Sequence, residues 1–357
     1  MGPVFKFGVV LAAAILAVAP LPRHLVERVY SRGVYPMVQP ALTTLSNSTS
    51  FAWFDAIVVV AVTAMAVMWT VRLRSPRRRT QGIGRTLAVL TLDSLALAAV
   101  LYLWFLGAWG LNYQRQPLRE QLDFREEQIT PDALRALAIR VVNAVNDLHP
   151  QAHAMGWPEL PATRDALEPA FVHAQRDLAM PWTARAGRPK PTLFNFYFTR
   201  VAIDGMTAPF VLETLANQTL LPFERAATVA HEWSHLAGYA DESDANFVGW
   251  LVCMRGDVPA QYSGWLALYG PVAGALPASE REEFSRRLDP GPRADLRAIS
   301  DRIRSHAIPT ASRAGYALYD RFLKANRVQA GIRSYGEVVR LMLGTRFTED
   351  GAPVVRK

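Results

Sequence analysis

The sequence predicts an α+β fold that is mostly helical, with a small sheet, preceded by three transmembrane helices. Three observations lead to this prediction. Charged residues are sparse up to Leu111, where three apolar runs lie, and frequent after it. Apolar residues repeat at helical spacing across most of the remaining chain. One stretch, Thr192 to Ile203, is rich in the aromatic and β-branched residues that are typical of strands.

The composition excludes several classes of protein. Half of the 357 residues are hydrophobic and only 20% are charged, which excludes a disordered chain. The single cysteine, Cys253, excludes an intramolecular disulfide and a cysteine-based zinc site. The net charge is +8, but the densest arginine cluster flanks an apolar run. This placement indicates membrane topology, and we expect no nucleic-acid partner.

The apolar runs cover about Phe7–Leu21, Phe51–Val71 and Thr86–Leu111. The second and third are long enough to span the ~30 Å of hydrocarbon in a bilayer. The first is shorter and resembles the core of a signal peptide, but Pro20 disfavours cleavage after Ala19, so we expect an uncleaved span. Residues 1–111 are therefore expected to form a membrane domain, and residues 112–357 a water-soluble domain.

The loop between the second and third runs determines the expected orientation. It carries six arginines and no acidic residue: Arg72, Arg74, Arg77, Arg78, Arg79 and Arg85. The positive-inside rule places this loop in the cytoplasm. The soluble domain is then on the extracytoplasmic, periplasmic side of the cytoplasmic (inner) membrane, whose lipid is an expected partner. Trp104, Trp109 and Tyr113 fit an aromatic belt at the outer surface, and we interpret Asp55 and Asp93 as structural acids.

In the soluble domain, Thr130 is a predicted N-cap before Pro131, and the helix that they open is expected to run to about His149-Pro150. A second helix is expected over Asp165–Leu178. Strands are expected over Thr192–Ile203 and Pro209–Thr214. Pro222 should open a helix that continues to Gly238. Six more helices are predicted: Glu242–Met254, Tyr262–Tyr269, Ser279–Leu288, Arg293–Ser305, Thr310–Asn326 and Tyr335–Leu343.

One motif carries chemistry: His231-Glu232-Trp233-Ser234-His235, an HExxH pattern in the helix that begins at Pro222. Residues i and i+4 share one helical face, so both imidazoles can bind one ion. Zinc is the expected ion, because it prefers nitrogen and carboxylate ligands and leaves one position open for water in catalytic sites. Glu232 can take a proton from that water and pass it to a leaving amine, which makes it the predicted general base.

Two carboxylates compete to be the third zinc ligand. Asp241 gives the spacing HExxHxxGxxD of metzincin-type enzymes. Glu242, followed by Ser-Asp-Ala-Asn, resembles the signature of gluzincin-type membrane peptidases and would project from the first turn of the next helix. We favour Glu242, because Asp241 is well placed to cap that helix. Asp244 and Asn246 either bind a ligand histidine through a hydrogen bond or lie in solvent.

The segment from His231 to Asn246, HEWSHLAGYADESDAN, resembles the core of a bacterial membrane family classified as a domain of unknown function. That family is zincin-like and carries HExxHxxGxxxExxAN after N-terminal membrane spans. The resemblance implies a zincin-like, zinc-dependent, peptidase-like protein. His231, His235 and Glu242 match its ligands, and Glu232 matches its base. The likeness extends to five further segments: Glu27–Tyr30, Trp109–Tyr113 with Arg115, Tyr319-Asp320, Leu323–Asn326 and Ser334–Gly336.

We therefore expect a membrane-anchored zinc metallopeptidase that hydrolyses a peptide or protein substrate. One alternative is a non-catalytic zincin-fold module for binding or assembly, although the intact Glu232 argues against it. The other is a zinc hydrolase of a non-peptide amide, such as one in the cell wall.

The predicted strand near Phe194–Arg200 could bind the peptide at its edge. His149, His153 and His173 show no ligand spacing and are interpreted as surface or satisfied core residues. Five residues are candidates to stabilise an oxyanion: Tyr239, Arg255, His306, Tyr319 and Tyr335.

Overall fold

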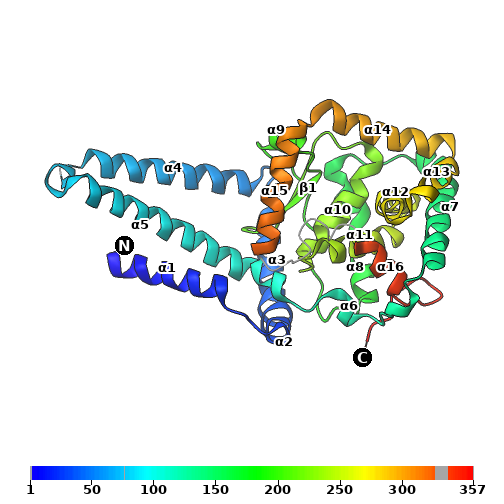
Figure 1. Cartoon of the computed structure of the whole chain (residues 1–357), viewed down its shortest axis with the longest axis horizontal. Helices are drawn as coiled ribbons and strands as arrows, with labels where there is room; N and C mark the ends of the chain where they lie inside the picture. The colour runs from blue at the N-terminus through cyan, green and yellow to red at the C-terminus, as the bar shows by residue number, and fades with distance from the viewer. Residues whose placement is uncertain (1, 76, 326–336, 357) are drawn as a thin grey trace.

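The computed structural model describes residues 2–75, 77–325 and 337–356. Three long helices, α1 (Pro3–Val18), α4 (Trp53–Arg74) and α5 (Arg77–Ala108), extend together from one side of a helical body (Figure 1). Within the described residues, α4 and the Gly82–Ala108 part of α5 are long and apolar enough to cross a membrane. Helix α1 meets that criterion only together with the bent helix that follows it. The structure therefore supports two to three membrane-spanning helices.

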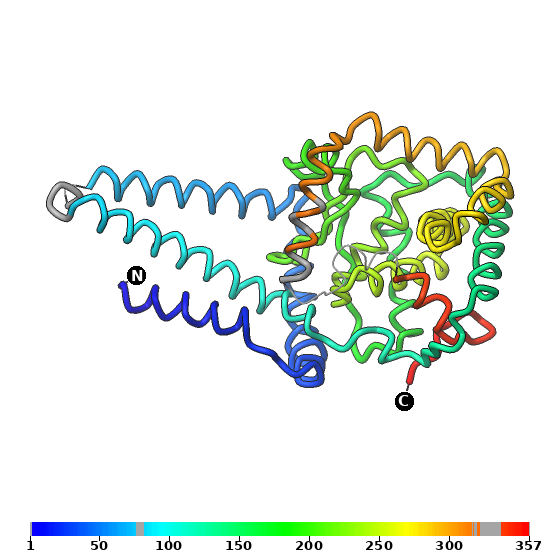
Figure 2. The backbone as a smooth tube through the Cα atoms, viewed as in Figure 1, coloured from blue at the N-terminus to red at the C-terminus, as the bar shows by residue number. Residues whose placement is uncertain are grey.

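Between α1 and α4 the chain forms α2 (Arg23–Leu25), a π-helix η1 (Val26–Val34) and α3 (Tyr35–Asn47). The body then contains helices of different lengths and two strands, joined by short turns. Figure 2 shows that its last described segment returns to its beginning, where Leu122 and Val355 form an antiparallel bridge. The elements of the body are η2 (Gly110–Gln114), α6 (Leu118–Gln121), η3 (Glu126–Gln128), α7 (Pro131–Met155), η4 (Leu160–Ala162), α8 (Thr163–Asp177), α9 (Asn195–Val201), β1 (Gly205–Ala208), β2 (Glu213–Ala216), α10 (Pro222–Leu236), α11 (Glu242–Met254), α12 (Val258–Ala275), α13 (Ala278–Arg286), α14 (Pro290–His306), α15 (Pro309–Ala325) and α16 (Val338–Gly344).

Most predicted helices of the body are confirmed, with shifted ends. Thr130 caps α7 as expected, because its hydroxyl accepts a hydrogen bond from the Ala133 N–H at 3.1 Å. However, α7 continues through Pro150 to Met155. A proline inside a helix removes one hydrogen bond, and here the buried Ala152 keeps the last turns packed on the body. Tyr335, the expected start of the last predicted helix, lies outside the described residues.

The strand predicted over Thr192–Ile203 is wrong, because α9 occupies Asn195–Val201. Aromatic composition favoured a strand, but the buried residues there, Phe198 and Val201, repeat at helical spacing. The described strands are instead β1 and β2, which form an antiparallel pair with Thr207 opposite Thr214. The predicted strand at Pro209–Thr214 overlaps only the start of β2. The expected substrate edge near Phe194–Arg200 is therefore also wrong.

The two acids within the apolar runs have structural partners. Asp55 accepts hydrogen bonds from the Thr192 hydroxyl at 2.6 Å and the Leu193 N–H at 2.8 Å. Asp93 pairs with Arg72 at 3.0 Å and with Lys6 of α1. Asp55 thus ties α4 to the body, and Asp93 ties α5 to the other two long helices.

A buried ion pair fixes the start of α4 to the sheet. The Glu213 carboxylate of β2 lies 2.7 Å from Lys190 Nζ, and both side chains are almost fully buried. The same carboxylate accepts the backbone N–H groups of Trp53 at 3.1 Å and Phe54 at 3.0 Å. These N–H groups belong to the first turn of α4 and have no partner within the helix. Glu213 therefore caps a long apolar helix from a distant strand.

We expect Lys190→Met to destabilise the protein by about 3–5 kcal/mol, because it leaves Glu213 charged and buried without a cation. The measurement is denaturant unfolding of the full chain in detergent micelles. Arg135→Met is the matched control, since it removes a cation from the solvent-exposed pair with Glu280 and should change stability little. Equal losses in both variants would contradict a special role for the buried pair.

Candidate metal centre

Helix α10 places two imidazoles on one face. Pro222 occupies its first turn, and the Glu224 carboxylate accepts the Leu221 N–H at 2.9 Å, so the helix begins where the sequence predicts. Val229 and Trp233 are fully buried in the core. His231 and His235, four residues apart, point together from the same helix, with their Nε2 atoms 3.1 Å apart.

The end of α10 orients His235. Gly238 adopts φ +88°, a left-handed conformation that favours glycine, and ends the helix as predicted. The Tyr239 N–H bonds the Ser234 carbonyl and the Gly238 N–H bonds the His235 carbonyl, which together form a Schellman turn. This turn brings the Tyr239 carbonyl to 2.7 Å from His235 Nδ1. Because a carbonyl only accepts, Nδ1 carries the single proton of the neutral imidazole, and Nε2 is the nitrogen whose lone pair can bind a metal ion.

Helix α11 brings a carboxylate to the two imidazoles. The Asp241 side chain accepts the Ser243 N–H at 2.9 Å and caps α11, which is the role predicted for it as the alternative to metal binding. Glu242 is the first residue of α11 and is almost fully buried. Its Oε2 lies 3.2 Å from His231 Nε2 and 3.7 Å from His235 Nε2. The structure therefore brings Glu242, and not Asp241, to the histidines.

The three donor atoms fit zinc. A tetrahedral zinc ion with ligands at about 2.0–2.1 Å separates those ligands by about 3.3 Å. The observed separations of 3.1, 3.2 and 3.7 Å lie close to this value. The two imidazole rings are perpendicular, at 89°, so their in-plane lone pairs can converge on one point. His231, His235 and Glu242 could thus hold a zinc ion with one position left open.

The charges of this group retain a proton that a metal ion would have to displace. Burial disfavours the charged imidazolium of His235, but the Glu242 carboxylate outweighs this and raises the pKa of His235 to about 9. Burial likewise opposes ionisation of Glu242, but the two histidines hold the pKa of its carboxyl well below the usual value. At neutral pH a metal ion would therefore displace a proton from His235.

Glu232 is held beside the histidines by β1. Its Oε2 accepts a hydrogen bond from the Thr207 hydroxyl at 2.9 Å. A Cβ on Gly205 would lie 2.7 Å from Glu232 Oε1, so β1 approaches this closely only because residue 205 is glycine. Burial raises the pKa of the Glu232 carboxyl, while His231, His235 and Thr207 oppose the rise. Glu232 is thus a buried, oriented carboxylate whose pKa is moved toward neutrality.

Three side chains from the first third of the chain bind carbonyl groups at the end of α10. The Trp109 indole donates to the His235 carbonyl and the Tyr35 hydroxyl donates to the Leu236 carbonyl, both at 2.8 Å. Arg115 donates to the Gly238 carbonyl at 3.0 Å and is held by Glu27 through two contacts of 3.0 Å. The sequence likeness included Trp109 and Arg115, but it assigned them no role.

The aromatic belt predicted at the outer end of α5 is corrected for two of its three members. Trp109 is buried, and the ring of Tyr113 packs edge-on against it at 5.0 Å. Only Trp104 is half exposed, and its indole donates to the Phe210 carbonyl at 2.8 Å. The end of α5 therefore packs into the metal centre, because its aromatic residues cover the last turn of α10.

Asp244 and Asn246 of α11, for which the sequence left two roles, differ in their surroundings. Asp244 accepts the Leu118 N–H at 3.0 Å, and burial raises the pKa of its carboxyl to about 7. It makes no hydrogen bond to either histidine, since the Tyr239 carbonyl serves His235. Asn246 is half-buried and lines a small pocket with His231 and Trp250. Of these two residues, only Asn246 lies where it can contact a ligand at the metal centre.

None of the described side chains expected to stabilise an oxyanion is engaged at the centre. The Tyr239 ring lies under the Arg115 guanidinium at 4.9 Å, and Arg255 pairs with Asp177. His306 lies at the end of α14 and contacts the Arg302 carbonyl. Tyr335 and the side chain of Tyr319 lie outside the described part of the structure.

The sequence analysis missed Tyr113 as a candidate. Burial raises the pKa of its phenol, and the nearby carboxylates of Glu242 and Asp241 add to the rise. Its ring packs against Trp109, whose own ring contacts His235, so Tyr113 is a candidate to donate a hydrogen bond near the centre. The only signal was its place in the segment Trp109–Tyr113, which the family resemblance included.

A second group of possible ligands has a different geometry. The extension of α7 places His149 and His153 on one face, which contradicts the expectation that they show no ligand spacing. The ligand atoms of His149, His153 and Asp295 lie within 4.8 Å of one another, and the two rings are tilted at 33° with centroids 4.1 Å apart. Asp295 Oδ2 contacts His153 at 2.8 Å and Tyr262 at 2.6 Å. Because the Asp295 carboxylate already binds His153 and Tyr262 through hydrogen bonds, we interpret the group as a hydrogen-bond network, with His153 exposed and His149 half-buried.

His173, the third histidine of that interpretation, is half exposed and lies 3.7 Å from Asp177.

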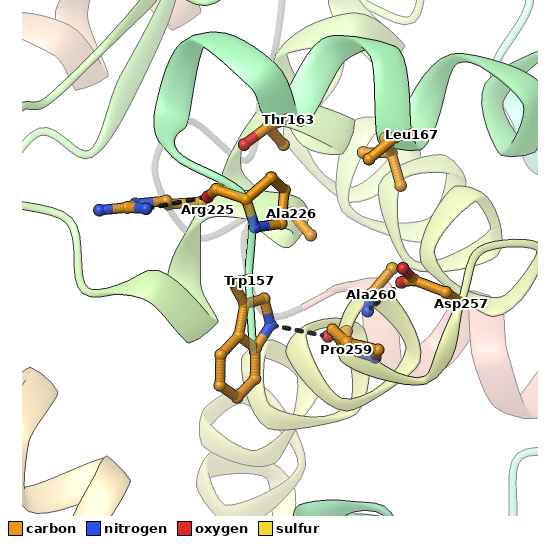
Figure 3. A pocket seen from close by; sticks show the side chains of 10 residues that line it. Trp157, Thr163, Leu167, Arg225, Ala226, Asp257, Pro259 and Ala260 are labelled. Carbon is orange, nitrogen blue, oxygen red and sulfur yellow. Dashed lines mark hydrogen bonds between the residues drawn. The ribbon is translucent and has the colours of Figure 1, made fainter. Parts of the chain in front are cut away.

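A separate pocket lies near the start of α10, and its polar side chains are engaged in the fold (Figure 3). There the Trp157 indole donates to the Pro259 carbonyl, and Arg225 donates to the Pro158 carbonyl. Asp257 caps α12. Since its polar groups serve the fold, this pocket is not the candidate site.

Comparison with known proteins gives one match. The model of the family described as "Protein of unknown function (DUF3810)" matches residues 30–343. The chain belongs to this family. The DUF3810 match covers α4, α5 and the residues of the candidate metal centre, in agreement with the family resemblance drawn from the sequence. No curated protein and no solved structure matches the chain.

We expect Glu242→Ala to remove most bound zinc, because it deletes one of three donors in this DUF3810 protein. Asp241→Ala should keep zinc and lose about 1 kcal/mol of stability, the usual effect of removing an N-cap. Zinc is measured by elemental analysis of the purified chain, and stability by denaturant unfolding. The reverse pattern of zinc retention would make Asp241 the ligand.

Proposed function

We propose that this DUF3810 protein is a membrane-anchored zinc metallopeptidase with a zincin-like body and three transmembrane helices. One observation carries the proposal: three donor atoms at distances that suit tetrahedral zinc, beside a buried carboxylate that follows the first histidine. The residues of this site come from two successive helices. Helix α10 supplies His231, Glu232 and His235, and helix α11 supplies Glu242.

In this proposal the chain's own residues divide the work. A zinc ion bound by the three donors would supply Lewis-acid chemistry, activating a water and polarising the scissile carbonyl. Glu232 accepts the proton of the attacking water and delivers it to the leaving amine. Its raised pKa suits both steps, and Thr207 holds its carboxylate in place. Tyr113 is our candidate to stabilise the negative charge that develops on the substrate oxygen.

The sheet supports a peptide as the substrate. Among the described strands, β1 pairs only with β2, so its other edge can pair with an extended chain. Thr207 of β1 also binds Glu232, which places this edge next to the proposed base. A peptide bound along β1 would thus lie beside the catalytic carboxylate. This edge replaces the one that the sequence analysis placed near Phe194–Arg200.

Glu232→Gln should retain zinc but lower hydrolysis by about 10²–10⁴-fold, because the amide accepts no proton at neutral pH. The assay is the digestion of a peptide library by the full chain in micelles, with zinc content measured in parallel. Asp244→Asn is the matched control, as it neutralises a nearby buried acid that does not touch the histidines.

Turnover near the wild-type rate in the Glu232→Gln variant would contradict the assignment. If the wild-type chain cleaves no peptide but releases amides from cell-wall material, the substrate class is wrong while the zinc chemistry stands. If it binds zinc and cleaves neither substrate, a non-catalytic module is the better description.

We also propose that the body lies on the extracytoplasmic side of the cytoplasmic membrane, based on the arginines between α4 and α5. Met155 of α7 is 56% exposed and far along the chain from the spans. Met155→Cys, in a Cys253→Ala background, should react with an impermeant thiol reagent in intact spheroplasts. Labelling only after lysis would show the opposite orientation.

A further inference from the structure

Residues Arg23–Asn47, which comprise α2, η1 and α3, form a helix with an inverted distribution of polarity; we call it the interface helix. The side chains that it turns toward the body are polar at every fourth position: Glu27, Ser31, Tyr35, Gln39, Thr43 and Asn47. Offset by two residues, a second series is exposed and apolar or small: Leu25, Val29, Gly33, Met37, Ala41 and Leu45. A surface helix of a soluble protein has the opposite arrangement.

The polar series binds the body along the whole helix. Besides Glu27 and Tyr35, the hydroxyl of Ser31 contacts Asn112 at 3.0 Å, and Thr43 donates to the Leu212 carbonyl at 3.0 Å. Gln39 and Asn47 make paired hydrogen bonds to the backbone between residues 185 and 188. These contacts fix which face of the interface helix points away from the protein.

The π-helix explains how both series stay on opposite faces. In an α-helix, with 3.6 residues per turn, positions four residues apart drift steadily around the axis. The hydrogen bonds of a π-helix reach one residue further, which winds the chain less tightly and turns the drift in the other sense. Segment η1 (Val26–Val34) therefore compensates for the drift in α3 (Tyr35–Asn47). The outer series remains one continuous stripe.

The outer stripe is well exposed and has basic borders. Met37 is 69% exposed, Val29 59% and Leu45 51%. Exposed arginines, Arg23, Arg28 and Arg32, lie along its first half. An apolar stripe bordered by cations is the composition that binds at the boundary between acyl chains and anionic headgroups.

The neighbouring elements place this stripe at a membrane surface. The chain turns by 113° between α1 and the interface helix, and α4 begins shortly after it ends. Figure 1 shows α3 crossing the side of the body from which α1, α4 and α5 extend. Further apolar side chains, Phe51, Leu193 and Phe196, are more than half exposed near the start of α4. The stripe is thus continuous with the candidate membrane spans on both sides.

We propose that the interface helix lies in the plane of the membrane and that its outer stripe contacts phospholipid acyl chains. The occupant of this surface is lipid, with the three arginines near anionic headgroups. Through Tyr35 and the Glu27–Arg115 pair, the same helix binds the turn that follows His235. The metal centre is therefore held next to the membrane surface. The lipid contact does not depend on the peptidase activity proposed above.

The test uses the full chain in liposomes of phosphatidylethanolamine and phosphatidylglycerol, in a Cys253→Ala background. Val29→Cys, Met37→Cys and Leu45→Cys each receive an environment-sensitive fluorophore. Ile139→Cys and Met155→Cys of α7 are matched controls, because these apolar residues are 44% and 56% exposed away from the stripe. We expect spin-labelled lipids to quench the stripe labels several-fold more than the controls, and aqueous iodide to quench them several-fold less.

Two outcomes would overturn the proposal. Iodide quenching equal to that of the controls would show that the stripe faces water. Protection from both quenchers would show that protein covers it, either a second copy or another chain. Circular dichroism of each labelled chain checks the fold, and the three positions test the stripe independently.

Discussion

Helix α10 ends inside the protein, where its last carbonyl groups have no access to bulk water and need donors from elsewhere. The Schellman turn at Gly238 supplies two, and Trp109, Tyr35 and Arg115 supply the others. The last three donors all precede residue 116 in the chain. The end of α10, which carries two of the candidate metal ligands, is therefore completed by the segments that connect it to the candidate membrane helices.

This constraint also sets the geometry of the candidate centre. The turn that satisfies the α10 carbonyls carries the Tyr239 carbonyl, which orients His235. It then directs the chain into α11, whose first residue, Glu242, faces both histidines. Buried carboxylates elsewhere in the chain follow the same rule, since Glu27 and Glu213 each have a cation and further donors. These buried carboxylates thus lie where cations and hydrogen bonds fix their position.

The two histidine pairs show what spacing alone leaves open. His149 and His153 have the same separation along a helix as His231 and His235, yet their ring planes lie at only 33°, and Asp295 binds His153 and Tyr262 through hydrogen bonds. At the second pair the rings are perpendicular and a carboxylate lies within 3.7 Å of both Nε2 atoms. The difference arises from what packs against each pair, because a helix by itself allows several rotamers for both.

Features that depend only on residues close together in the chain could be predicted from the sequence. These include the apolar runs, the start of α10 at Pro222, its end at Gly238, the cap at Asp241 and the start of α11 at Glu242, since caps and helical faces are local properties. The residues that the structure brings together at positions 231, 235 and 242 are those that the sequence predicted to bind zinc, and zinc binding stays a prediction.

Other features depend on contacts between distant parts of the chain. Tertiary structure made a helix of Asn195–Val201 despite its strand-like composition, and it brought Thr207, Trp109 and Tyr113 to the centre from distant segments. It also turned the polar face of residues 23–47 toward the body. That face is held there by hydrogen bonds, whereas a surface helix usually packs its apolar face on the body. Such contacts join residues that are 25 positions apart for Thr207 and Glu232 and 126 for Trp109 and His235, so no local pattern could have predicted them.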